Sequence, residues 1–194
     1  LDGGTVVVNV SDLIDSCTDA SVNNAGAPND TGGFDDPTPV RLVDLDLQKE
    51  SGFFADTSNG LEYAGFFRYT LKNNGSDPLS NLSLADDFLG SNAKIASVLA
   101  VNTIQVNNSG SVNCDSFVAG NDFMHNSTPV AITGPNCVLA AGNTVEVVVQ
   151  VVFTIDTANN DRILNSATAF AADSDGAAVS DVSDGDGDPA NDLN

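Results

Sequence analysis

The sequence contains little of several residue types on which many binding and catalytic proteins depend. Its 194 residues include no Trp, one His, one Met and two Tyr, and six Lys and Arg residues oppose 27 Asp and Glu residues, for a net charge of −21. Nucleic-acid binding depends on Lys and Arg neutralising phosphates, and anionic membrane surfaces attract the same residues. The charge balance therefore excludes nucleic acid and disfavours anionic membrane surfaces.

Long apolar runs are also missing. No stretch approaches the roughly 18 consecutive apolar residues that a membrane-spanning helix requires, and no signal-peptide pattern is present. We therefore expect no membrane insertion, and a secreted protein would be present here in its mature form. The length suits one domain of sandwich size with an extension.

Catalytic motifs are equally scarce. His125 is the only histidine, and the sequence holds no Gly-x-Ser-x-Gly elbow, no His cluster for zinc and no phosphate-cradling glycine loop. A sugar-cleaving site usually adds aromatic platforms, but there is no Trp, and both tyrosines, Tyr63 and Tyr69, fall on a face predicted to be buried. We therefore interpret His125 as a loop residue and predict that the protein is not an enzyme.

The chain does contain frequent alternation of apolar and polar residues, the pattern of half-buried β-strands. It is clearest in residues 43–48, 62–72 and 144–156. The predicted core-facing residues of the last two segments are Tyr63, Gly65, Phe67, Tyr69, Leu71, Val145, Val147, Val149, Val151, Phe153 and Ile155. The opposite face of the third segment also carries Val148 and Val152, so we expect this strand to be central in its sheet.

A predicted hairpin completes the pattern. Residues 165–172 and 177–182 form the expected final strand pair, and Asp173-Ser174-Asp175-Gly176 is a favourable turn sequence between them. Residues 91–100 are predicted to form a short helical turn. Strands at this spacing, divided by Asn-Gly, Asp-Pro and Ala-Gly turns, indicate an all-β fold, an antiparallel β-sandwich.

The N-terminal part differs in composition from the rest. Residues 16–39 are rich in Asn, Gly, Pro and Asp and hold almost no bulky apolar residue, which is a linker composition. We therefore divide the chain into an N-terminal donor strand and linker (1–39), a β-sandwich (40–184) and an acidic tail (185–194). A short strand on a long tether needs a sheet edge with which to pair, in its own domain or in a neighbour.

Two segments near the ends of the chain resemble each other. Gly4–Asp12 and Gly176–Asp184 are identical at five of nine positions. A single domain rarely needs two copies of its last strand, so the repeat is typical of a module that carries the closing strand of another, as in a fibre or tandem array. We predict that Val6, Val8 and Val10 of the first copy dock into a neighbouring sandwich.

The cysteines suggest an oxidising environment. Cys114 and Cys137 flank a segment rich in Asn, Ser, Gly and Pro, which a disulfide would close. Cys17 is left over, for an intermolecular bond or as a free thiol. The alternative is three reduced cysteines. The disulfide interpretation predicts an extracellular or cell-surface location.

Acidic residues are concentrated near the C-terminus in a pattern that suits calcium. Three of the 27 acidic residues are Glu and the other 24 are Asp. Asp184, Asp186 and Asp188 alternate with glycine, and calcium binds six to eight oxygens, so we predict a calcium site there. Asp173 and Asp175, or residues 35–36, would supply further ligands. A solvated acidic tail, or a high-salt habitat, would also explain the acidity.

Three motifs resemble a conserved repeat of bacterial and archaeal surface proteins, a domain of unknown function numbered eleven in its series. Residues 69–86 resemble a strand followed by N-x-G-x-x-P-L-x-N-V-x-V-x-D, residues 139–144 resemble L-x-P-G-x-T, and residues 164–169 resemble I-x-N-T-A-x-A. The resemblance covers about residues 40–184 and implies an immunoglobulin-like β-sandwich, often in tandem, that forms stalks or adhesive fibres. It implies no catalytic residues. The insert from Cys114 to Cys137 departs from the pattern and leaves open a binding surface of its own.

These observations lead to three hypotheses. The first is a subunit of an extracellular filament, a head-to-tail homopolymer formed by strand donation and stiffened by calcium. The second is one repeat of a giant tandem-repeat surface adhesin. The third is a calcium-dependent carbohydrate-binding module whose glycan or cell-surface partner binds at the loop between Cys114 and Cys137.

Overall fold

The structure is a computed structural model, and it describes residues 41–52, 54–90, 94–125, 128–156, 163 and 165–183. The chain divides into two units, residues 1–41 and 42–194, and the description below concerns the second. The predicted donor strand with Val6, Val8 and Val10 lies outside the described residues, as do Cys17 and the tail from residue 184 onward.

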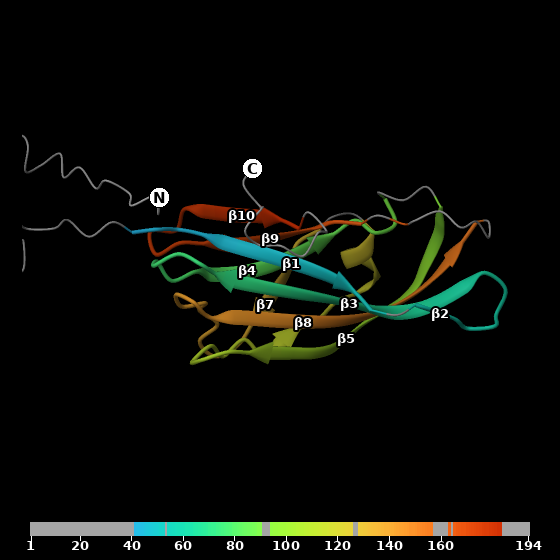
Figure 1. The fold of residues 1–194 in the computed structure, drawn as a ribbon, viewed down its shortest axis with the longest axis horizontal. Helices are drawn as coiled ribbons and strands as arrows, with labels where there is room; N and C mark the ends of the chain where they lie inside the picture. Colours follow the sequence, from blue (N-terminus) through green and yellow to red (C-terminus); the bar gives the residue numbers. More distant parts are fainter. Residues whose placement is uncertain are drawn as a thin grey trace, which may run out of the picture. The chain divides into compact units, whose positions relative to one another are not determined.

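The described chain forms two antiparallel sheets that face each other (Figure 1). In the first sheet the strand order is β1-β3-β8-β5. The short β2 also pairs with β3, at a different part of its length from β1. Its strands are β1 (Leu45–Ser51), β2 (Ala55–Asp56), β3 (Glu62–Asn73), β5 (Ile95–Asn108) and β8 (Thr144–Ile155). As expected, β8 is central, because it pairs with both β3 and β5.

The second sheet has the order β10-β9-β4-β7-β6. Its strands are β4 (Ser80–Asp86), β6 (Ser116–Phe117), β7 (Val130–Thr133), β9 (Ala167–Ala172) and β10 (Ala178–Val182). The single turn of 3₁₀-helix η1 (Asn121–Met124) lies between β6 and β7 in the chain. Within the described residues, no helix is long and apolar enough to cross a membrane.

The strand order is that of an immunoglobulin domain with an insertion. When β2, β6 and β7 are left out, seven strands remain. Counted along the chain from 1 to 7, strands 1, 2, 5 and 4 (β1, β3, β8 and β5) form one sheet, and strands 7, 6 and 3 (β10, β9 and β4) form the other. This is the two-sheet arrangement of a constant-type immunoglobulin domain. The predicted all-β sandwich is therefore confirmed. The inserted β6 and β7 extend the second sheet beyond β4.

The core lies where the alternation predicted it. Val145, Val147, Val149 and Val151 of β8 are fully buried, while their neighbours along the strand are partly exposed. Four rings from separate segments pack at one end of this core, with centroid separations of 5.0 to 5.5 Å: Phe54, Phe67, Phe88 and Phe153. Burial of these side chains is the main favourable contribution to folding.

The predicted helical turn at residues 91–100 is wrong where the structure describes this segment. Residues 95–108 form β5, a 14-residue edge strand paired with β8. Three register shifts interrupt that pairing, and they disturb the two-residue alternation that would have marked the strand. Such bulges also protect an edge strand from pairing with another chain.

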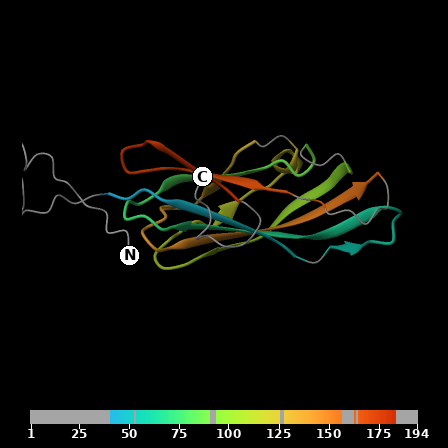
Figure 2. The same cartoon turned by 45° about the horizontal axis from the view of Figure 1, so that its top comes forward.

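The first and last described strands, β1 and β10, lie side by side and run in the same direction (Figures 1 and 2). At one end, the Leu42 carbonyl accepts a hydrogen bond from Asp77 N–H, and the Asp77 carboxylate accepts two from Ser174. Further along, Leu47 N–H donates to the Asp181 carboxylate at 2.7 Å. Residue number rises in both strands along this contact, so β1 and β10 are parallel.

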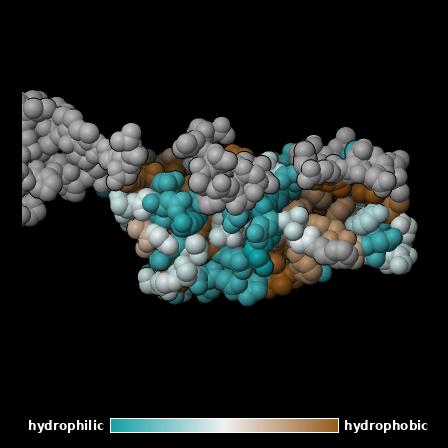
Figure 3. All heavy atoms as spheres, viewed as in Figure 1, coloured by the Kyte–Doolittle hydropathy of each residue, from teal (hydrophilic) through white to brown (hydrophobic). Residues whose placement is uncertain are grey.

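The outer face of the first sheet carries a network of charged and polar side chains across its middle strands. Arg68 of β3 forms ion pairs with Glu50 of β1 at 3.1 Å and with Glu146 of β8 at 3.3 Å. Asn107 of β5 also donates to Glu146. Hydrophilic side chains gather over the middle strands in the view of Figure 3. This exposed network contributes little to stability but keeps the face solvated.

Candidate functional site

A polar cluster lies between the two sheets, and all but one of its residues are buried in the hydrophobic core. It consists of Lys49 from β1, Tyr69 from β3, Asp86 from the end of β4 and Asn165, which precedes β9. Each strand residue occupies an inward position of its alternation. Lys49 follows Leu45 and Leu47 on the buried face of β1, for example, so the strand directs its side chain inward.

Asp86 is the centre of the cluster and accepts hydrogen bonds from the other three residues. Its Oδ2 accepts from Lys49 Nζ at 2.6 Å and from Tyr69 Oη at 2.7 Å, and its Oδ1 accepts from Asn165 Nδ2 at 2.9 Å. The side chains of Lys49 and Asp86 are 3% and 0% exposed. The carboxylate thus joins side chains from both sheets, out of contact with water.

The electrostatics follow from this burial. Desolvation lowers the pKa of the Lys49 ammonium, although the neighbouring Asp86 charge opposes the shift. Desolvation, followed by the same negative charge, raises the pKa of Tyr69 well above its usual value. The Lys49 Nζ also lies 4.3 Å from the ring centroid of Phe67, where the aromatic face attracts a cation.

One atom in the cluster lacks a partner. Asn165 Oδ1 is buried and forms no hydrogen bond, although its Nδ2 is bound to Asp86. A buried carbonyl without a donor costs about 1–3 kcal/mol, so such atoms are rare and usually have a specific explanation.

The sequence-predicted calcium ligands are placed only in part. Asp173 and Asp175 lie in the turn between β9 and β10, as predicted, where Asp173 Oδ1 accepts from the backbone N–H groups of Asp175 and Ala177. Asp173 therefore stabilises the turn. Asp184, Asp186 and Asp188 lie outside the described residues. In the part that the structure describes, no three acidic, His or Cys side chains are grouped closely enough to hold a metal ion. Calcium stays a prediction.

Cys114 and Cys137, the predicted pair, are joined by a disulfide with Cα atoms 4.5 Å apart. The segment between them is more ordered than a loop, because it forms β6, η1 and β7 and contributes Phe117 and Phe123 to the core. His125 follows η1, and its ring nitrogen Nδ1 lies 2.6 Å from the Asn121 carbonyl oxygen.

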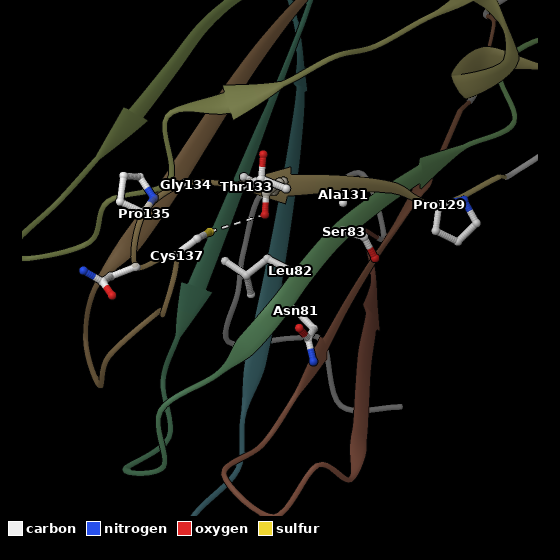
Figure 4. A pocket seen from close by; sticks show the side chains of 11 residues that line it. Asn81, Leu82, Ser83, Pro129, Ala131, Thr133, Gly134, Pro135 and Cys137 are labelled. Carbon is white, nitrogen blue, oxygen red and sulfur yellow. Dashed lines mark hydrogen bonds between the residues drawn. The ribbon is translucent and has the colours of Figure 1, made fainter.

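A pocket of about 550 Å³ lies between β4 and the chain around β7 (Figure 4). The polar side chains in its wall are those of Asn81, Ser83, Thr133 and Asn136. No residue that lines it is aromatic or acidic, and Cys137 is already in the disulfide. The pocket thus has neither a platform for a sugar ring nor a group for acid–base chemistry.

Sequence reasoning missed the buried cluster. None of the site residues predicted from the sequence belongs to it. Two signals were present. Lys49 continues the inward alternation of Leu45 and Leu47, and Asp86 and Asn165 are polar positions of two of the motifs quoted above. The structure brings those two motif residues into direct contact.

Comparisons with known proteins identify no family. No protein-family profile matches the chain, and no curated protein is significantly similar to it. Membership in the surface-repeat family therefore stays a prediction. One solved structure that matches is the biomass-sensing module of the Rsgi2 protein of Clostridium thermocellum, which resembles a family 3 carbohydrate-binding module of the cellulosome. It is 15% identical, with a TM-score of 0.39, covering 68% of this chain and 93% of that one. A likeness of this size carries no functional argument.

Proposed function

We propose that this chain is a structural subunit of an extracellular filament, assembled head to tail by donation of its N-terminal strand. The observation that carries this proposal is the parallel, side-by-side arrangement of β1 and β10. A load that reaches β1 through the N-terminal linker at Leu42 acts along the strand, so it strains the hydrogen bonds between β1 and β3 together instead of opening them one at a time. Resistance of this kind suits a module in a fibre under tension.

The repeated sequence supports strand donation. Its second copy includes β10, an edge strand in which Val179 is partly buried and Val182 is 50% exposed. A sequence that forms an edge strand in this sandwich is suited to forming one in a neighbour. In the proposal, Val6, Val8 and Val10 enter the apolar face of the neighbouring module. Their counterparts in the second copy, Ala178, Ser180 and Val182, are exposed in β10, so the donated strand would bury the opposite face from β10. Because the contact joins different surfaces of successive copies, it extends into an open fibre.

Further features of the proposal rest on the cysteines and the aspartates. The Cys114–Cys137 disulfide supports an oxidising, extracellular compartment. Calcium bound by Asp184, Asp186 and Asp188 would stiffen the junction between modules, and Cys17 could lock it covalently. The protein acts in this proposal without catalysis.

The test is electron microscopy of the purified chain with and without calcium. Deletion of residues 1–15 should leave a folded monomer, shown by an unchanged circular dichroism spectrum, that no longer forms filaments. Substitution of Val6, Val8 and Val10 by Asp should have the same effect, whereas the matched change Val7→Asp should not. Filaments that persist after the deletion would refute strand donation.

The arrangement of β1 and β10 is equally compatible with one repeat of a long tandem adhesin. Denaturing electrophoresis of native material under reducing conditions separates the two cases. A filament subunit runs near the 19.9 kDa of this chain. A repeat of an adhesin runs far above it.

A further inference from the structure

We propose that Lys49 and Asn165 become joined by an intramolecular amide bond between their side chains, with Asp86 as the group that transfers protons. The inference is independent of the proposed function, because the bond would form within a single folded chain. It assigns a covalent modification site to the buried cluster, with the protein itself as its only reactant.

The first argument is position. The two oxygens of the Asp86 carboxylate hold the two reacting groups, Lys49 Nζ at 2.6 Å and Asn165 Nδ2 at 2.9 Å. An amine and a carboxamide bound to the same carboxylate are held next to each other. Such positioning turns a slow encounter into an intramolecular step with a high effective concentration.

The second argument is the environment of the amine. An ammonium has no lone pair and cannot attack a carbonyl, so the reaction requires a neutral Lys49. The Lys49 side chain is 3% exposed and lies among the rings of Phe67 and Tyr69, where burial disfavours the charged form. Asp86, at hydrogen-bonding distance, is placed to accept the proton.

The third argument is the unpartnered Asn165 Oδ1. The oxygen and the NH₂ group of a carboxamide exchange places when the end of the side chain turns over. Once Asp86 carries the proton from Lys49, the turned carboxamide can accept a hydrogen bond from the carboxylic acid through its oxygen. That bond gives the orphaned oxygen a donor and polarises the carbonyl carbon for attack.

The reaction balances without any added reagent. The Lys49 ammonium gives one proton to the Asp86 carboxylate, and the Nζ lone pair then forms a bond to Asn165 Cγ. A second proton passes from Nζ, by way of Asp86, to the Asn165 amide nitrogen. The Cγ–Nδ2 bond breaks, ammonia leaves, and Asp86 retains one proton. The site is electrically neutral before and after, so no unpaired charge is left in the core.

The consequence is a covalent link between the two sheets. Lys49 lies in β1 of the first sheet, and Asn165 lies just upstream of β9 of the second, which begins at Ala167. The bond would hold together the beginning and the end of the sandwich, as the buried hydrogen bonds already do.

Intact mass spectrometry of the full chain, with the disulfide reduced, tests the proposal. The protein should be lighter than its sequence predicts by one molecule of ammonia, and protease digestion should give one branched peptide that joins Lys49 to Asn165. Lys49→Met and Asn165→Ala should restore the calculated mass. The control Lys72→Met, on the same sheet, should keep the ammonia loss.

Two results would overturn the inference. One is a folded wild-type chain at its full calculated mass with no branched peptide. The other is an ammonia loss that persists in Lys49→Met, which would indicate succinimide formation at an Asn-Gly step such as Asn59-Gly60 or Asn74-Gly75. The wild-type digest decides the question even if a variant fails to fold.

Discussion

Reduction of the Cys114–Cys137 disulfide should lower the free energy of unfolding by about 3 kcal/mol. The bond closes a loop with a sequence separation of 23. On the chain-entropy account, a loop of this length restricts the unfolded chain by about 3 kcal/mol. The folded state changes little, because Phe117, Phe123, Met124 and Ile132 from the same segment stay packed in the core. We therefore expect a reduced protein that is folded but easier to unfold.

The assay is urea unfolding followed by circular dichroism, with and without reductant, in a Cys17→Ser background that prevents exchange with the third cysteine. The midpoint should fall by roughly 1–3 M urea with reductant, at the usual dependence of stability on denaturant. The double variant Cys114→Ala/Cys137→Ala should not respond to reductant. A loss below about 1 kcal/mol, or an equal response in the double variant, would refute the reasoning.

Two further predictions concern the buried cluster. Asp86→Ala removes the counter-charge of Lys49 and should lower the unfolding free energy by roughly 3–5 kcal/mol in urea titration, whereas Lys49→Met combined with Asp86→Leu should cost less. The raised pKa of Tyr69 means that the folded state holds the phenolic proton more tightly than the unfolded state. Stability should therefore fall as the pH rises above about 10, and Tyr69→Phe should show a smaller fall in thermal unfolding measured across that range.

The fold was predictable where one face of a strand is buried and its pairing is regular. In β3 and β8 every second side chain enters the core, so alternation alone located both strands and their inward faces. In β5 the bulges shift the alternation, and Leu99 and Ile104 are exposed although both are large and apolar. Local periodicity cannot reveal a strand whose register is determined by its partner.

Of the buried cluster, the inward position of the lysine could be predicted from the sequence, but its carboxylate partner could not. Extending the alternation of Leu45 and Leu47 by two residues places a Lys on the inner face, and a buried Lys requires a carboxylate. The sequence offers 24 Asp as candidates. The choice of Asp86 depends on how β1 and β4, in different sheets, pack against each other, and no local pattern records that packing.

The cluster and the repeated segment both concern how the sandwich would carry tension in a filament. A donated strand would deliver load to the sandwich from its neighbour, and the load would reach β1 through Leu42, which precedes the strand. Lys49 lies seven residues further on, and through Asp86 it is already connected to Asn165, just before β9 and β10. An amide bond between Lys49 and Asn165 would carry the load directly from the first strand to the last pair, so that the strands between them are never pulled. The chain has six basic residues, and it buries one of them, Lys49, between its first strand and its last strand pair. A covalent link at this position would shield the strands in between from tension.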